Sequence, residues 1–377
     1  MAQTMAQPTA NARMTRNPGG GRGSAASAIL GILGEILLTL AAVLALYIAW
    51  QLWWTGVESE QAQSSQRDSV SWVDPQKNGN DYTIAKAQQG DPPVQPQGAV
   101  TGDLIAQLYV PRFGQSWQRN VVEGTDAYQL SRHGLGHYSE TQMPGQLGNV
   151  AIAGHRSGYG EPLAHVDELQ PGDKIILRTQ DYWYVYTYTD YKIVTPESTE
   201  VVAAVPGQPG ATPTDRYITL TTCEPRYTEA THRWISYGKF DYWAKVSDGI
   251  PQELAASASS GGVQFERGQS SPLAKVSGSM ENLVIALAIA YVVVYLAALV
   301  AWRYPVLRQI KYGVRSKPSA SLYGWFYRHQ PGPMLIRWVL MLILALAIAA
   351  TLFEWAFPWA ASNIPYLKVT SNFVAVE

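Results

Sequence analysis

The chain of 377 residues carries 28 Lys and Arg against 29 Asp and Glu, and its formal net charge is −1. This balance excludes a nucleic-acid binder built on a large basic surface. Charged residues make up 15% of the chain and hydrophobic residues 47%, which indicates very apolar segments within a polar remainder. The single cysteine, Cys223, excludes an intrachain disulfide framework and a multi-cysteine metal site.

Three apolar segments are long enough to cross the ~30 Å hydrocarbon core of a membrane. We expect transmembrane helices at 28–54, 283–302 and 334–356. The first ends in a Trp cluster suited to a membrane interface, and it is longer than the apolar core of a cleaved signal peptide. It is therefore interpreted as an uncleaved anchor. Its one acid, Glu35, is expected to snorkel or to be protonated near the headgroups.

The basic residues predict how the chain crosses the membrane. The tail 1–27 carries three Arg and no acid, and residues 303–337 carry seven Lys or Arg and no acid. Loops rich in Lys and Arg remain in the cytoplasm. The tail and the loop 303–333 are therefore predicted to be cytoplasmic, with 55–282 and the tail 357–377 outside the plasma membrane. The basic loop would also suit anionic membrane lipid, although a topology signal alone accounts for its charges.

The segment predicted to lie outside divides by composition. Residues 55–98 are rich in Gln, Ser, Asp, Asn and Pro and are expected to form a mostly irregular stalk, and 251–282 is predicted to be a flexible linker. Between them, 99–250 has the usual size of one domain and is expected to fold by itself. Short β-type runs separated by Gly and Pro recur there, with one short helix expected at Glu161–Leu169, which is typical of an all-β barrel or sandwich. The runs are 104–110, 149–154, 174–179, 183–194, 217–222 and 233–240.

Cys223 ends one of these runs, Thr-Leu-Thr-Thr-Cys, and Glu224-Pro225 breaks the strand directly after it. The end of a strand is rigid behind and open in front, so it is a good place to present a nucleophile. A lone cysteine is also often a buried structural thiol. Spacing alone favours neither interpretation.

Two further residues could complete a thiol site. His155 follows an apolar run and opens a Gly-containing loop, and an imidazole beside a thiol can hold the pair as thiolate and imidazolium. Arg233 lies ten residues beyond Cys223, where an antiparallel strand would bring it beside the thiol to stabilise an oxyanion. The alternatives are a loop histidine bonded to backbone and a solvated surface arginine. Arg226 and Arg156 compete for the oxyanion role.

These residues together resemble the signature of the sortase family. Its TLxTC motif is matched by TLTTC, with an Arg ten positions later and a Gly-His-Arg loop about 70 residues earlier. Residues 101–247 are similar to a sortase catalytic domain, and 135–177 is especially similar to actinobacterial class E, with class D next. The resemblance implies an eight-stranded β-barrel and a cysteine transpeptidase that needs no metal or organic cofactor. The catalytic set that it implies is His155, Cys223 and Arg233.

The resemblance also assigns two residues to substrate binding. Thr222 matches the position that helps to shape the pocket for the sorting signal, and His137 matches a histidine often found near the site. The chain departs from the family pattern in its two spans after the domain, because sortases usually have one N-terminal anchor and at most one C-terminal anchor. The expected architecture is thus an all-β barrel with one N-terminal and two C-terminal transmembrane helices.

The implied reaction cleaves a sorting signal of exported surface proteins or pilins. Cys223 would attack the carbonyl between Thr and Gly of an LPxTG-like signal, with class E favouring LAxTG, and form a thioacyl enzyme. An amine from a peptidoglycan precursor or a pilin lysine would then resolve it. The alternative function is a non-enzymatic membrane-anchored protein for wall binding or assembly. The sequence does not support an L,D-transpeptidase, because the Ser-His-Gly-Cys context of that enzyme's cysteine is absent. It gives little support to a transporter, because the three apolar spans lack paired charges.

Overall fold

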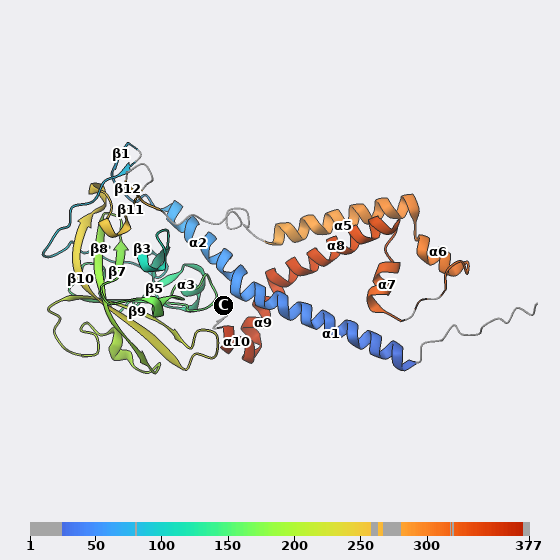
Figure 1. Cartoon of the computed structure of the whole chain (residues 1–377), viewed down its shortest axis with the longest axis horizontal. Helices are drawn as coiled ribbons and strands as arrows, with labels where there is room; N and C mark the ends of the chain where they lie inside the picture. Colours follow the sequence, from blue (N-terminus) through green and yellow to red (C-terminus); the bar gives the residue numbers. More distant parts are fainter. Residues whose placement is uncertain are drawn as a thin grey trace, which may run out of the picture. The chain divides into compact units, whose positions relative to one another are not determined.

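Eight strands close into one barrel in the computed structural model, which describes residues 25–79, 81–257, 263–266, 280–316, 318 and 320–371. Around the barrel the strand order is β10-β8-β7-β3-β4-β5-β6-β9, with β9 and β10 paired to close it. The neighbours are antiparallel except for β4 with β5 and β6 with β9, which are parallel. The strands are β3 (Leu104–Tyr109), β4 (Gln118–Glu123), β5 (Leu135–His137), β6 (Gly148–Gly154), β7 (Lys174–Arg178), β8 (Tyr182–Val194), β9 (Arg216–Glu224) and β10 (His232–Lys245). The expected all-β eight-stranded barrel is confirmed (Figure 1).

The central strand β8 shows how the sequence builds this barrel. Its residues alternate between two hydrophobic clusters, because successive side chains of a strand point to opposite faces. Tyr184, Tyr186 and Tyr188 lie in the larger cluster, while Trp183 and Val185 lie in the second. The second cluster also contains residues from outside 99–250, namely Ala85, Leu254 and Phe265. The core therefore draws on both segments that were expected to be a stalk and a linker.

The six expected β-runs all appear as strands within a few residues of their predicted bounds. Strands β4 and β5 were not expected, because β4 is polar at its start and β5 has only three residues. The helix expected at 161–169 is wrong: the structure has only a 3-10 turn at Val166–Glu168. A different helix, α3 (Ala127–Arg132), is capped by Asp126, whose carboxylate accepts from two backbone N–H groups.

The stalk expected to be mostly irregular begins with a helix. Helix α1 (Ala25–Ala49) continues through a π-helical turn at Trp50–Trp54 into α2 (Thr55–Ser69). The Glu, Gln and Arg of α2 are good helix formers, and the polar composition had suggested irregular structure instead. Only the part beyond α2 is mainly irregular. It has two short strands, β1 (Lys77–Asn78) and β2 (Asp81–Tyr82), which pair with each other.

Polar side chains hold α2 against the barrel. The backbone N–H of the buried Asn120 on β4 donates to Gln63 Oε1 at 3.0 Å, and its Nδ2 donates to the Gln63 carbonyl at 3.0 Å. Arg67 Nη1 donates to Asn120 Oδ1 at 2.8 Å, and Ser59 Oγ donates to the Arg132 carbonyl at 3.2 Å. In each of these contacts a donor and an acceptor satisfy each other's hydrogen-bonding capacity. Together the contacts fix α2 against the barrel.

Within the residues that the structure describes, three helical segments are long and apolar enough to cross a membrane: Ala26–Ser69, Met280–Trp302 and Met334–Asn363. This confirms the expectation of one N-terminal and two C-terminal helices, whereas their orientation remains a prediction. The helices described after the barrel are α5 (Met280–Trp302), α6 (Pro305–Lys311), α7 (Leu322–Arg328), α8 (Met334–Thr351), α9 (Phe357–Asn363) and α10 (Pro365–Ser371), with a π-helical turn at Leu352–Ala356. Two further short strands, β11 (Ala256–Ser257) and β12 (Val263–Gln264), pair with each other.

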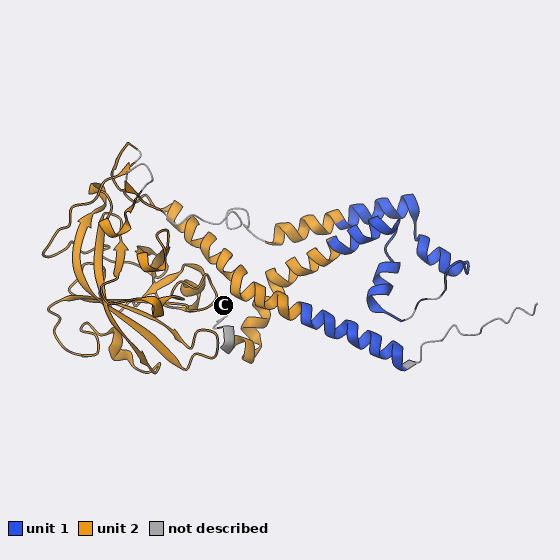
Figure 2. Ribbon diagram, viewed as in Figure 1, with its two compact units in different colours: residues 1–42, 291–342 blue, residues 43–290, 343–377 orange. Residues whose placement is uncertain are grey.

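The chain divides into two compact units (Figure 2). The larger comprises residues 43–290 and 343–377 and contains the barrel, α2 and an aromatic cluster in which Trp54 packs edge-on against Phe353. The smaller comprises residues 1–42 and 291–342. Within the smaller unit, the Glu35 carboxylate accepts from the backbone N–H of Leu322 at 2.6 Å, at the first turn of α7.

Candidate active site

The cysteine and the candidate arginine lie directly opposite each other on two paired strands. Strands β9 and β10 are antiparallel, and their register places Cys223 against Arg233. Side chains of such a pair leave the same face of the sheet, with Cβ atoms roughly 4.5–5.5 Å apart. The loop length between the two residues had predicted this neighbourhood. The structure brings them together as expected.

A hydrogen bond from Thr222 aligns the strand that carries His155 with the strand that carries Cys223. Strand β6 runs parallel to β9, and Ala153 opposite Thr221 is their last register pair. Thr222 Oγ1 then donates to the Gly154 carbonyl at 2.7 Å, which carries the alignment one residue further. The next residues along the two strands are His155 and Cys223. Since neighbouring strands are ≈ 4.8 Å apart, the imidazole and the thiol start from adjacent positions.

All of these residues line one pocket of about 360 Å³. Cys223, His155 and Arg233 all line it, and Thr222 beside them is 3% exposed with its hydroxyl already donated to the neighbouring strand. Further lining comes from the end of β8, where Val194 is paired with Arg233, and from the turn that follows β8. These lining residues are Val194, Thr195, Pro196, Ser198, Thr199, Val201 and Val202. Small, uncharged side chains of this kind suit an extended peptide more than a charged small molecule.

Burial keeps the thiol and the imidazole neutral in this pocket. Desolvation raises the pKa of Cys223 above its ordinary value, and the nearby charges of Arg233 and Arg156 oppose that rise. Desolvation also lowers the pKa of His155 to about 4. Both shifts favour a thiol and a neutral imidazole at neutral pH, and not the thiolate–imidazolium pair that the sequence allowed.

The three candidate arginines differ in their partners. Arg156 is ion-paired with Glu224 and, at 3.3 Å, with Asp167. Arg226 Nη2 donates to the Glu161 carboxylate at 2.6 Å. Among the residues described, Arg233 has no ion pair, and its one side-chain hydrogen bond is to the neighbouring His232 carbonyl at 3.0 Å. Its guanidinium can therefore turn toward a substrate oxygen without breaking an ion pair.

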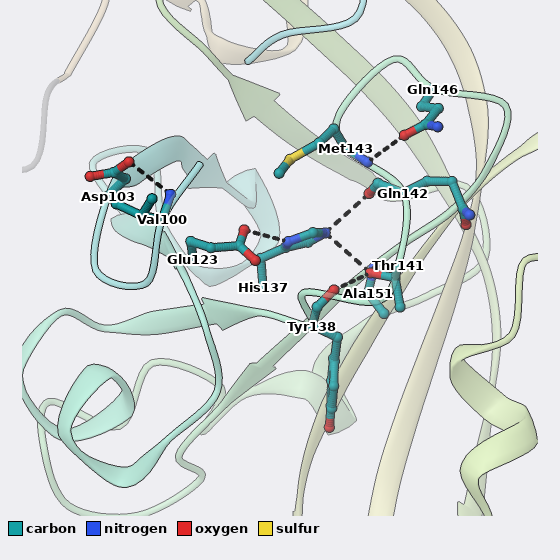
Figure 3. Close-up of polar contacts among 10 residues, drawn as sticks. All are labelled: Val100, Asp103, Glu123, His137, Tyr138, Thr141, Gln142, Met143, Gln146 and Ala151. Atoms are coloured by element: carbon teal, nitrogen blue, oxygen red, sulfur yellow. Dashed lines mark hydrogen bonds and ion pairs between the residues drawn. The ribbon is translucent and has the colours of Figure 1, made fainter. Parts of the chain in front are cut away.

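The structure does not bring His137 to the pocket. Its Nδ1 lies 2.9 Å from a Glu123 carboxylate oxygen, and its Nε2 lies 3.1 Å from the Gln142 carbonyl and from Thr141 Oγ1 (Figure 3). The side chain is fully buried and lines no part of the thiol pocket. A carbonyl can only accept, so Nε2 donates there, and the ring ties the 138–142 turn to the barrel. The sequence-based assignment of His137 to substrate binding is replaced by this structural role.

The next residue, Tyr138, lies in the pocket instead. Figure 3 shows the two side chains pointing away from each other, as alternation along an extended segment requires. Tyr138 lines the pocket, and its hydroxyl lies 3.0 Å from Thr221 Oγ1. The sequence reading missed Tyr138. The signal that could have identified Tyr138 is the alternation of an extended segment: if His137 is buried in the barrel, its neighbour Tyr138 faces the other side, toward the pocket.

Two other residues missed from the sequence touch the histidine ring. Tyr159 lies against His155 with ring centroids 4.6 Å apart, and Ser131 Oγ lies 3.4 Å from His155 Nε2. The backbone N–H of Tyr159 in turn donates to Thr55 Oγ1 of α2 at 3.0 Å. Helix α2 therefore supports the loop that carries the histidine. No short-range pattern in the sequence indicates this contact, because Thr55 and Tyr159 are far apart along the chain.

Comparison with known proteins agrees with this geometry. The family model described as Sortase domain matches residues 108–241. Sortase SrtE1 of Streptomyces coelicolor is 34% identical over 231 residues, which are 59% of this chain and 60% of that relative. Sortase SrtE2 of the same organism is 31% identical over 243 residues, which are 62% of this chain and 90% of that relative. The chain belongs to the sortase family.

Sortases are cysteine transpeptidases, and the expected resemblance to class E is confirmed by these two relatives. The solved structure of an SrtA sortase from Actinomyces oris is 42% identical, with a TM-score of 0.43, and the match covers 45% of this chain and 96% of that one. This sortase spans about 60% of the length of SrtE1. Its one cysteine lies within the region matched by the family model.

Proposed function

We propose that this protein is a membrane-anchored sortase that cleaves an LPxTG-like or LAxTG-like sorting signal between Thr and Gly and transfers the protein to an amine. The observation that carries the proposal is the register of β9 and β10, which sets the only cysteine opposite Arg233 in a pocket that His155 also lines. The resemblance to class E favours LAxTG as the preferred signal. The substrates would be exported surface proteins or pilins.

The first half-reaction uses the neutral pair found in the pocket. The Cys223 thiol gives its proton to His155, and the thiolate adds to the Thr carbonyl carbon. The Arg233 guanidinium donates to the oxyanion that forms. The imidazolium then protonates the departing Gly amine, the C–N bond breaks, and a thioester to Cys223 remains.

The second half-reaction reverses these proton transfers. An amine from a peptidoglycan precursor or a pilin lysine enters, and His155 accepts its proton as the nitrogen attacks the thioester. The new amide forms, and the thiol of Cys223 is regenerated. If the barrel is extracellular, as the basic segments predict, enzyme and substrate are both tethered at one membrane surface. Tethering raises their effective concentration without tight binding.

The decisive experiment measures the mass of Cys223 after exposure to a signal peptide. The full chain in detergent is incubated with LAxTG and LPxTG peptides, and intact mass is recorded without an acceptor amine. We expect an increase equal to the peptide up to Thr, together with release of the Gly-containing fragment. Cys223→Ala serves as the control and should show neither. A folded protein that binds the peptides but gains no covalent mass would support the non-enzymatic alternative.

A further inference from the structure

Each of the three candidate catalytic residues is followed in the sequence by a member of one side-chain cluster. The members, in the order of His155, Cys223 and Arg233, are Arg156, Glu224 and Trp234. None of the three lines the thiol pocket. Successive side chains of a strand point to opposite faces, so Glu224 and Trp234 leave the sheet on the face away from the thiol. We call these three residues the flanking cluster.

The guanidinium of Arg156 holds the flanking cluster together. It is ion-paired with Glu224, and its Cζ lies 5.0 Å from the centroid of the Trp234 ring. A second carboxylate oxygen, Oδ1 of Asp167, lies 3.3 Å from Arg156 Nη2. Tyr191 of β8 stacks on the Trp234 ring, with centroids 4.3 Å apart and ring planes 8° apart. Residues from four separate segments therefore meet at this guanidinium and its indole neighbour.

Burial makes the ion pair sensitive to the loss of either partner. The side chain of Arg156 is 6% exposed and that of Glu224 is 27% exposed. Removing one partner of a buried pair leaves a charge without compensation, which costs much more than breaking an exposed pair. The two residues are therefore strongly constrained to stay together, and the backbone segments that carry them are constrained with them.

The ion pair lies just beyond the reacting groups along β6 and β9. On the near side of the candidate histidine and cysteine, Thr222 donates its hydroxyl to the Gly154 carbonyl at 2.7 Å. On the far side, one residue further along each segment, Arg156 pairs with Glu224. The imidazole and the thiol are thus bracketed by two contacts between the same two segments. The contact of Arg156 with Trp234 extends this alignment to β10, which carries the candidate oxyanion residue.

The charge of Arg156 also acts on the thiol. Together with Arg233 it opposes the effect of desolvation on Cys223, so both cations lower the pKa of the thiol. The two arginines nevertheless differ in what they can do. Arg156 is engaged by two carboxylates, whereas Arg233 can turn toward a substrate oxygen. Arg156 is therefore suited to hold the site and to supply charge, and not to bind the oxyanion.

We propose that the flanking cluster positions the reacting groups from the opposite face of the sheet: the ion pair of Arg156 with Glu224 keeps the imidazole beside the thiol, and the Arg156 charge favours the thiolate. Trp234 joins the strand of the oxyanion residue to the same pair. The proposal rests on the function proposed above, because it concerns the alignment of that reaction. No member of the cluster lines the pocket, so all three are positioning residues.

Single-turnover acylation of the full chain in detergent by an LAxTG peptide tests the alignment. A misplacement of about 1 Å can cost a hundredfold in rate, so Arg156→Gln and Glu224→Gln should each lower the maximal rate about ten- to hundredfold. The peptide concentration that gives half of the maximal rate should stay nearly unchanged, because neither residue lines the pocket. The double variant should be no slower than the slower single variant, because both substitutions remove the same contact.

Arg216→Gln is the matched control. Arg216 lies at the other end of β9, where its Nη2 pairs with Asp91 at 2.9 Å and its Cζ lies 6.0 Å from the centroid of the Phe240 ring of β10. This variant should be acylated as fast as the unaltered chain. Unchanged maximal rates in both single variants would overturn the proposal, as would multiplied losses in the double variant or an equal loss in Arg216→Gln. Glu224→Gln keeps the test decisive if Arg156→Gln folds poorly, because the Glu224 side chain is partly exposed.

Alkylation of Cys223 by iodoacetamide separates this proposal from the proposed function, because it needs no sorting signal. Arg156→Gln should slow alkylation severalfold at pH 7, since it removes a charge that favours the thiolate. Glu224→Gln keeps that charge, still paired with Asp167, so its alkylation should be no slower than that of the unaltered chain. A purely structural role would instead loosen the pocket and speed alkylation in both variants, and that result would overturn the proposal.

The two failures can be told apart in the unaltered chain. If it forms no thioester with either signal peptide, the proposed function is wrong, and the order of the alkylation rates still decides whether Arg156 acts on the thiol. If it forms the thioester while Arg156→Gln is alkylated and acylated as fast as the unaltered chain, the proposed function stands and the positioning role is refuted.

Discussion

Replacing Gly56 by Ala tests whether α2 supports the loop that carries His155. Gly56 lies inside α2, and a Cβ added there would sit 3.0 Å from the Gly160 nitrogen and 3.1 Å from its Cα. Both atoms are backbone, so the loop or the helix has to shift by a few tenths of an ångström. Ala is favoured over Gly in a helix by about 1 kcal/mol, while overpacking costs about 1–3 kcal/mol. We expect a net loss of up to roughly 2 kcal/mol in the free energy of unfolding.

The same shift should reach the reaction through Tyr159. Its N–H donates to Thr55, and its ring lies against His155 with centroids 4.6 Å apart. Because a misplacement of about 1 Å can cost a hundredfold in rate, a shift of about 0.3 Å should slow acylation of Cys223 roughly fourfold. Single-turnover acylation by a sorting-signal peptide measures this, with thermal unfolding of the full chain recorded beside it.

Gly34→Ala is the matched control for this experiment. Gly34 lies in α1, in the same continuous helix, and no atom lies within 4 Å of an added Cβ. It should leave acylation unchanged and leave stability unchanged or slightly higher. If Gly56→Ala behaves like Gly34→Ala in both measurements, α2 does not press on the loop and the supporting role is refuted.

Four further predictions concern the thiol pocket. Cys223→Ala should abolish the covalent mass increase while the unfolding temperature stays within a few degrees, because a small side chain at a strand end contributes little packing. Arg233→Lys should slow single-turnover acylation of Cys223 about 10²–10³-fold. Arg226→Lys should slow it far less, because the guanidinium of Arg226 is paired with Glu161. If Arg226→Lys proved the slower of the two, the oxyanion role would move to Arg226. Burial raises the pKa of the Cys223 thiol, so its alkylation by iodoacetamide should be slow at neutral pH and accelerate above pH 9. The charge of Arg233 lowers that pKa, so Arg233→Gln should slow alkylation further at neutral pH, and fast alkylation of the unaltered chain at pH 7 would contradict the buried neutral thiol. His155 binds a proton below about pH 6.5 in the unfolded chain, but only below about pH 4 in the folded protein. The free energy of unfolding should therefore fall by roughly 3 kcal/mol as the pH drops from about 6.5 to about 4. A His155→Phe variant that keeps the whole of this pH dependence would disprove the cause.

The sequence predicted the parts of the site that depend on one or two neighbouring strands. Apolar alternation marked β8, and the distance from Cys223 to Arg233 matched an antiparallel pair joined by a short loop. His155 was identified by its position after an apolar run, although its neighbourhood to Cys223 depends on the parallel pairing of β6 and β9. Parallel partners are joined by long connections, so their register cannot be deduced from spacing.

The features that the sequence did not predict depend on tertiary contacts. The composition of 55–69 suggested an irregular stalk, yet Asn120 and its partners hold that segment as helix α2. His137 looked like a pocket residue by resemblance, but strand alternation turns it toward Glu123 and leaves Tyr138 facing the pocket. In each case local preference was weak, and packing against a distant part of the chain decided the outcome.

The register between β9 and β10 also determines where this protein can change during evolution. Backbone pairing from Tyr217 opposite Lys239 to Glu224 opposite His232 fixes Cys223 against Arg233, and the exposed residues 227–229 between the strands take no part in it. Insertions in that connection can therefore reshape the rim of the pocket while the reacting groups keep their alignment. A single residue inserted within either strand would instead turn the thiol or the guanidinium to the opposite face of the sheet. New substrate preferences are thus accessible through changes in loop length, whereas the lengths of the two strands are constrained.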